Sequence, residues 1–312
     1  MTRKFLPAAV ALRGGFSIVL LFFLPAIVRA QELQPRAYLP SPVGLGFLGI
    51  SYSGNSGGLL FDPSLPIQNG HVDAHIPALA LGGTFDVFGR TGQVLGVLPY
   101  VVADLSGTFA GVEAARHRSG LSDSTLRFSI NLHGAPAMHL REYARYRPKL
   151  IVGVSLTATA PIGQYDPNVL VNIGTNRWAV KPEIGIARFF GKWEIEGAFG
   201  AWIYMQNSDF FGNGYRTQEP LGSAQAHVVR LLPRRMWLAF DSTFFTGGRT
   251  TVNGKLNADY AGNTRIGATY GIGIGRRQSV RIAYFDGVTA RVGADSQSLT
   301  VAYQVIWHQA SR

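Results

Sequence analysis

The sequence predicts an all-β fold, a transmembrane antiparallel up-and-down β-barrel of about 12 strands. Three observations predict it. The chain has 38 glycines and is only 15% charged, where about 25% is typical of soluble domains. Along most of its length apolar residues alternate with polar ones, as in a strand with one face in lipid and one in a polar lumen. Beyond residue 30 no stretch reaches the roughly 18 consecutive apolar residues of a membrane helix.

The first element is a signal peptide at residues 1–30. A basic start is followed by an apolar run over 16–28, which is shorter than the roughly 20 residues of a membrane span. The triplet Val28-Arg29-Ala30 has the small residues of a cleavage site. We expect cleavage after Ala30, which leaves residues 31–312 as a single barrel domain in the bacterial outer membrane.

The composition argues against several other classes of protein. Removing residues 1–30 takes away four basic and no acidic residues, so the 29 Lys and Arg fall to 25 against 18 Asp and Glu. These charges are scattered, without the dense basic stripe of nucleic-acid binding, and we expect no nucleic-acid partner. The chain has no cysteine, which excludes disulfides and thiolate sites. We also expect no cofactor and no metal.

The strands follow from period-two alternation. In the last segment Leu299, Val301, Tyr303, Val305 and Trp307 share one face, and polar residues share the other. Tryptophans at segment ends suggest interfacial girdles, which favour a membrane barrel over the alternative of a soluble β-sandwich; they are Trp178, Trp193, Trp237 and Trp307. The expected strands, in order, are centred near residues 43–53, 76–88, 94–106, 123–133, 149–160, 176–189, 192–206, 221–231, 236–246, 264–275, 278–286 and 298–308.

The connections alternate between tight turns and longer polar loops, as in barrels with short periplasmic turns and long extracellular loops. One periplasmic connection, 134–148, is long, and its residues from Pro136 onward predict a short amphipathic helical turn that plugs or caps the periplasmic mouth. Pro77, Pro99 and Pro182 fall within expected strands, where each removes a ladder donor, so bulges or strand ends are expected there.

Residues 161–185 read PIGQYDPNVLVNIGTNRWAVKPEIG, and with them the chain resembles an outer-membrane transporter family associated with the MetA pathway of phenol degradation. The resemblance implies a β-barrel that transports aromatic or other hydrophobic compounds, and it covers most of the mature chain. The matching positions are Gly163, Tyr165, Asp166, Pro167, Leu170, Asn172, Gly174, Asn176, Arg177, Trp178, Lys181, Pro182, Glu183 and Gly185.

Charged residues on neighbouring strands form the first candidate site. Lys181 and Glu183 share one strand face, as do Glu194 and Glu196 on the next strand. A charge facing mid-membrane lipid costs about 2 to 4 kcal/mol, so these side chains should point into the lumen. Together with Arg127 they would form an ion-pair network. Such a network either stiffens a narrow barrel or makes a charged constriction that selects solutes.

The loop over 163–176 is the second candidate site. It carries Tyr165, Asp166, Asn172 and Asn176, with Arg177 directly after it. The loop could fold inward and gate the pore, or these residues could serve ordinary turn chemistry.

We expect no enzyme, because none of the seven histidines lies in a nucleophile-elbow or HExxH motif. His71, Asp73 and His75 are more simply solvated loop residues than a metal site. The leading hypothesis is a passive channel for a small-molecule solute, with outer-membrane lipid, lipopolysaccharide and the assembly machinery as partners. The alternatives are a barrel with a sealed lumen and, third, a lipid-acting enzyme with a histidine near a serine or aspartate on the outer rim.

Overall fold

The computed structural model describes residues 34–60, 67–109, 111–169 and 171–308. The predicted signal peptide lies outside these residues. Most of the described chain is strand, and no described helix is long and apolar enough to cross a membrane. The elements are β1 (Leu45–Leu60), β2 (Ile67–Val87), β3 (Arg90–Phe109), β4 (Val112–Leu121), β5 (Ser124–His133), α2 (Leu140–Tyr143), β6 (Leu150–Ala160), β7 (Ala179–Phe190), β8 (Trp193–Tyr204), β9 (Asn207–Phe210), β10 (Gly214–Gln218), β11 (Leu221–Leu232), β12 (Met236–Gly247), β13 (Thr250–Val252), β14 (Lys255–Leu256), β15 (Ala261–Ile274), β16 (Gln278–Thr289) and β17 (Gly293–His308).

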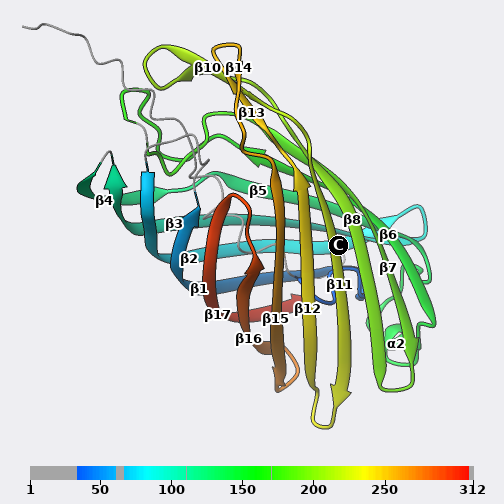
Figure 1. The fold of residues 1–312 in the computed structure, drawn as a ribbon. Helices are drawn as coiled ribbons and strands as arrows, with labels where there is room; N and C mark the ends of the chain where they lie inside the picture. The colour runs from blue at the N-terminus through cyan, green and yellow to red at the C-terminus, as the bar shows by residue number, and fades with distance from the viewer. Residues whose placement is uncertain (1–33, 61–66, 110, 170, 309–312) are drawn as a thin grey trace, which may run out of the picture.

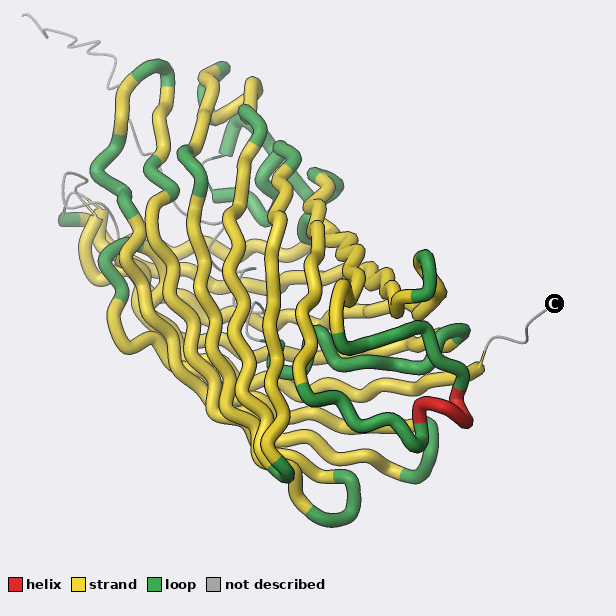
Figure 2. Tube along the Cα trace, turned by 90° about the vertical axis from the view of Figure 1, so that its right-hand side faces the viewer, coloured by secondary structure: helices red, strands yellow, loops and turns green. Residues whose placement is uncertain are grey.

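The long strands form one closed antiparallel ring (Figures 1 and 2). β1 pairs with β2 on one side and with β17 on the other, which closes the sheet. β3 pairs with β4 along its second half and with β5 along its first half, so β4 and β5 act as one strand interrupted at Ser122 and Asp123. The 13 strands of the sheet therefore make a barrel of 12 strand positions, as predicted.

Tight turns lie at one end of the barrel and long loops at the other. Both central residues of the β11–β12 turn, Arg234 and Arg235, have positive φ (57° and 61°), which matches the backbone twist of a two-strand hairpin. At the opposite end β9, β10, β13 and β14 form a separate small sheet above the barrel, at the top of Figure 1. The end with the long loops is the extracellular one by the usual asymmetry of these barrels.

Side chains alternate between the two faces of the wall as the sequence predicts. Large apolar residues such as Ile50, Phe199 and Phe240 are 58–60% exposed on the outside, while small and polar residues such as Ser53, Ser129 and Thr269 are buried inside. An apolar outer band of this kind faces lipid. The expected girdle holds for Trp178, Trp193 and Trp307, which are exposed.

Trp237 is a correction to the predicted girdle. It has the same strand phase as the buried residues Ala239 and Asp241, and its ring covers Gly271 of β15. It therefore points into the barrel, where the guanidinium of Arg36 lies 5.4 Å from the ring centroid.

The prolines interrupt hydrogen bonding without shifting the strands. Pro99 lies where β3 exchanges β5 for β4, and its carbonyl accepts a bond from the backbone of Ser122 (2.9 Å). A strand end was expected there. At Pro77 and Pro182 the register is the same before and after the proline, so the expected bulges are absent. The register shifts occur elsewhere, for example between Asn131 and His133.

The connection over 134–148 contains the predicted helical turn, but α2 spans only four residues (Figure 2). The segment lies along the periplasmic rim, where Ala135 and Ala137 bond with the β2–β3 turn. The carbonyl of Met138 accepts a bond from the backbone of Val43 (2.9 Å). This contact joins the rim to a second segment, residues 34–44, which enters the lumen ahead of β1.

Candidate functional site

Residues 34–44, called here the N-terminal segment, are held inside the barrel by Tyr38. The Tyr38 ring packs with Ile151, Ala187 and Ala198, which face inward. It also lies against Gly153 of β6 and Gly185 of β7, where a Cβ atom would overlap it. The two glycines thus leave a notch in the inner wall, and the tyrosine ring fills that notch.

The Tyr38 hydroxyl reaches the first charged group of the lumen. It donates to Glu183 Oε1 (2.8 Å) and lies 2.9 Å from Ser155 Oγ. Burial and the nearby Glu183 carboxylate raise the pKa of Tyr38 to about 12. The phenol therefore remains a neutral hydrogen-bond donor at physiological pH.

The same carboxylate gathers the cations predicted around it. Lys181 Nζ lies 2.7 Å from Glu183 Oε2, and Arg127 Nη2 lies 3.8 Å from Oε1. The Arg127 guanidinium also stacks 4.8 Å from the centroid of the Tyr38 ring. Gln225 of β11 donates a further bond to Glu183 (3.2 Å). The first part of the predicted network is therefore assembled from β5, β7 and β11 together with the N-terminal segment.

Glu194 and Glu196 form a separate group nearer the periplasm. Arg36 of the N-terminal segment supplies their cation: its Nε lies 3.2 Å from Glu194 Oε2, and its backbone N–H donates to Glu196 Oε2 (2.7 Å). The β7–β8 register places Glu183 opposite Gly200, four residues from Glu196 and roughly 13 Å along the strand. The strand register therefore keeps these glutamates apart from Lys181 and Glu183, with which they were expected to meet.

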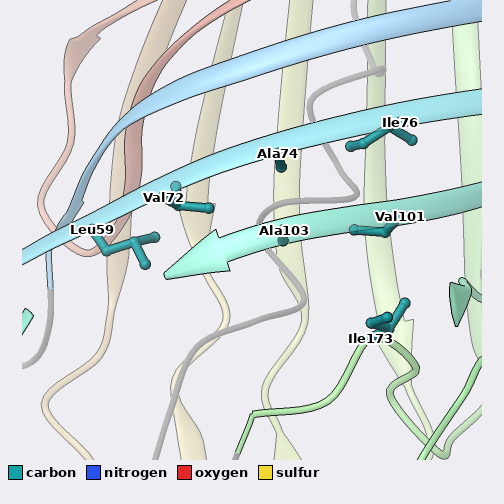
Figure 3. Packing of buried hydrophobic residues seen from close by; sticks show 7 residues of the cluster. All are labelled: Leu59, Val72, Ala74, Ile76, Val101, Ala103 and Ile173. Atoms are coloured by element: carbon teal, nitrogen blue, oxygen red, sulfur yellow. The ribbon is translucent and has the colours of Figure 1, made fainter. Parts of the chain in front are cut away.

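The loop between β6 and β7 folds inward. Ile173 packs in an apolar cluster on the inner wall with Leu59, Val72, Ala74, Ile76, Val101 and Ala103, and Figure 3 shows it facing the side chains of β2 and β3. The buried carboxylate of Asp123 fixes this position, because it accepts bonds from the backbone of Gly163 (3.0 Å) and from both the backbone and the hydroxyl of Thr175 (2.8 and 2.6 Å).

The predicted loop residues mostly bond within the loops. The Asp166 side chain caps Asn168, and Asn172 Oδ1 accepts from the Asp166 backbone (2.8 Å), which is ordinary turn chemistry. Asn176 donates to Asn207 (3.1 Å). Arg177 is buried; it bonds to Gln218 and lies 4.5 Å from the Tyr204 ring centroid.

Tyr165 links this loop to the next one. Its hydroxyl donates to the carbonyl of Asp209 (3.0 Å) and accepts from Asn207 Nδ2 (3.0 Å). Partial burial raises the pKa of Tyr165. The loop thus combines both sequence alternatives: turn bonds on its outer side and an inward-facing Ile173.

A cavity of about 180 Å³ lies between the loop and the N-terminal segment. Ile173, Thr175 and Arg177 line its upper part, and Tyr38, Arg127, Lys181, Glu183 and Glu196 line it lower down. Trp202 and Tyr204 add aromatic surface. Five of the ten predicted site residues therefore line one cavity, while the remaining five, which are Tyr165, Asp166, Asn172, Asn176 and Glu194, are not among its lining residues.

Two lining residues, Gln225 and His227 of β11, were not among the predicted site residues. His227 is buried, and its Nδ1 lies 2.7 Å from Oδ1 of the fully buried Asp241 on β12. Strand phase is the signal that could have found this pair. The tight turn predicted after Leu232 sets a register in which His227 is directly opposite Asp241.

The outer rim carries the remaining histidine–aspartate contacts. His71 Nε2 lies 3.3 Å from Asp73, and His117 Nδ1 lies 2.7 Å from Asp104, all on exposed side chains. Within the residues that the structure describes, no group of three or more His, Asp or Glu could hold a metal ion. No hydrogen bond joins a serine hydroxyl to His71 or His117 in the same part of the chain, so the third hypothesis lacks its nucleophile.

A closed ring of strands with an apolar outer band and a polar, partly filled lumen defines an outer-membrane β-barrel. The family described as "Putative MetA-pathway of phenol degradation" matches residues 69–303, and the chain belongs to that family. No curated protein matches the sequence.

Solved structures share the fold. The COG4313 outer membrane channel from Pseudomonas putida F1 is 21% identical, with a TM-score of 0.76 over 88% of this chain and 100% of that one. The β domain of the Bordetella autotransporter BrkA is 12% identical, with a TM-score of 0.48 over 85% of this chain and 100% of that one. The transport unit of the autotransporter AIDA-I from Escherichia coli is 10% identical, with a TM-score of 0.48 over 89% of this chain and 94% of that one.

Proposed function

We propose that the protein is a passive outer-membrane channel for small aromatic or other hydrophobic compounds, and not an enzyme. The observation that carries this proposal is an apolar strip inside the barrel. The lumen of a membrane barrel is usually polar, yet Val72, Ala74, Ile76, Val101 and Ala103 all face inward and are at most 2% exposed.

This strip continues into the cavity. Ile173 belongs both to the apolar cluster and to the cavity lining, so it joins the two surfaces. A hydrophobic solute that enters from the extracellular end meets apolar side chains down to the cavity. There the rings of Trp202 and Tyr204 take over, before the charged group around Glu183.

The charged residues have a second role in this proposal. Arg127, Lys181, Glu183 and Glu196 line the cavity, and the Arg127–Lys181–Glu183 group is internally paired. We propose that it shapes the narrow part of the passage together with Tyr38, with Arg177 and the loop that carries Tyr165, Asp166, Asn172 and Asn176 at its entrance. Glu194 holds Arg36 and so positions the N-terminal segment.

The remaining partners follow from the location. The apolar outer band contacts outer-membrane lipid, and the exposed polar rim above it, which includes His71 and Asp73, meets lipopolysaccharide. We also propose that the outer-membrane assembly machinery inserts the chain. Diffusion down a gradient requires no cofactor.

The experiment compares Val101→Thr with Val102→Thr in liposomes that contain the refolded protein. Val101 faces the apolar strip, whereas its neighbour Val102 has the opposite strand phase. An unpaired hydroxyl placed against the strip should slow toluene permeation about five-fold, and Val102→Thr should leave the rate unchanged. A wild-type protein that inserts but passes neither ions in planar bilayers nor toluene would instead support the sealed barrel.

A further inference from the structure

The pair formed by His227 and Asp241 is more elaborate than a lumen-filling contact. Asp241 is 0% exposed, and its second oxygen, Oδ2, accepts a bond from Thr269 Oγ1 of β15 (2.6 Å). Three neighbouring strands therefore hold one imidazole in a fixed orientation. His227 Nε2 makes no hydrogen bond to the described residues, and His227 lines the cavity.

The partners of Asp241 fix the chemistry of that open nitrogen. An ionised carboxylate only accepts hydrogen bonds, so the proton between the two side chains is on Nδ1. Arg281 of β16 interacts electrostatically with the same carboxylate, so the charge of Asp241 is balanced without a second cation. The ring is then neutral, and Nε2 presents a lone pair to the cavity.

We propose that His227 Nε2 is a specificity-determining acceptor that binds the hydroxyl of a one-ring aromatic alcohol. The inference rests on the proposed channel function and adds a solute class to it. A cavity of about 150 Å³ is known to admit benzene, and the cavity here is about 180 Å³. The rings of Trp202 and Tyr204 lie along the same cavity and suit an aromatic face.

The arrangement is a binding site and not a catalytic triad. Thr269 bonds to Asp241 and not to the imidazole, so the aspartate is the central member. The described residues place no hydroxyl nucleophile on Nε2. An acceptor held in this way can only select a solute that brings its own donor.

The test is isothermal titration of the detergent-purified, refolded barrel with phenol, anisole, toluene and benzoate. Anisole has the same ring and oxygen as phenol but no hydroxyl hydrogen. One neutral hydrogen bond predicts that the wild type binds phenol about 5- to 10-fold more tightly than anisole. His227→Phe should bind both equally, and His227→Gln, whose amide oxygen can accept, should recover part of the preference.

Thr243→Val is the matched control, because Thr243 is a buried inward residue of β12 that does not line the cavity. It should keep the full preference for phenol. Asp241→Asn tests the positioning role: an amide that donates to Nδ1 moves the ring proton to Nε2 and should abolish the preference while toluene still binds.

Two results would overturn the proposal while leaving the channel intact: a phenol preference that survives in His227→Phe, or benzoate that binds the wild type more tightly than phenol. If toluene, anisole and phenol all fail to bind the wild type, the aromatic channel itself is wrong. The two failures are therefore distinguishable.

Discussion

The hydroxyl of Tyr38 donates a 2.8 Å hydrogen bond to the carboxylate of Glu183, 145 residues further along the chain. Tyr38 belongs to no strand, and Glu183 lies near the middle of β7. This bond, with the notch at Gly153 and Gly185, holds the N-terminal segment inside the barrel. Changes at this contact should therefore affect both the stability of the barrel and the width of its lumen.

The stability of the Tyr38 contact should depend on alkaline pH. The pKa of Tyr38 is raised from 10 to about 12, so its stabilising contribution is complete below pH 10 and is lost as pH rises through 12. Wild type should be about 1 to 2 kcal/mol more stable than Tyr38→Phe at pH 8. Urea unfolding of both proteins between pH 8 and 12 checks this, and a difference that persists unchanged at pH 12 would contradict it.

Filling the notch should expel the N-terminal segment. A Cβ at Gly185 would overlap the Tyr38 ring, so Gly185→Val should cost about 1 to 3 kcal/mol and raise single-channel conductance. At Gly197, by contrast, no atom lies nearer than 3.8 Å to the position that a Cβ would occupy, so Gly197→Ala is the control. Equal conductance in both variants would show that Tyr38 does not narrow the passage.

Removing the Asp123 carboxylate should release the inward loop. Asp123→Ala loses three hydrogen bonds to Gly163 and Thr175 and should expose residues 163–176 to protease at least several-fold faster. Ser122→Ala is the matched control, since Ser122 is adjacent and 1% exposed, and its hydroxyl has no hydrogen-bond partner among the described residues. Cleavage of both variants at the wild-type rate would mean that other contacts hold the loop.

The lipid-facing side of the wall can be tested at Phe199, which is 60% exposed on the outside of β8. Phe199→Arg should destabilise the barrel in phospholipid vesicles by roughly 2 to 4 kcal/mol. Glu113→Arg, on an exposed strand beyond the membrane, should have little effect. The free energy of unfolding in vesicles measures both, and similar values would place Phe199 outside the hydrocarbon.

Alternation was sufficient to predict the barrel because each strand has one face in lipid, which leaves a strong apolar signal in segments such as Leu299 to Trp307. Residue type misled only where it was preferred over phase. Trp237 was assigned to the girdle as a tryptophan, although its phase matches the buried Asp241. The same phase, counted from the turn at Arg234, would have paired Asp241 with His227.

The N-terminal segment could not be predicted in this way. Pro35, Pro40 and Pro42 interrupt it, so it has no periodicity to read. Its partners lie far away in sequence: Arg36 is 158 residues from Glu194. Without that cation, Glu194 and Glu196 had no visible partner, and grouping them with Lys181 was the natural but incorrect inference.

The seam between β1 and β17 also dictates an order of events. The first and last strands pair along their full length, from Leu45 opposite His308 to Leu60 opposite Gly293, so the ring cannot shut until the final residues of the chain have arrived. Residues 34–44 precede β1 and end up enclosed. Threading a tethered peptide through a finished wall is far harder than enclosing it, so Tyr38 must reach its notch before the last strand zips into place.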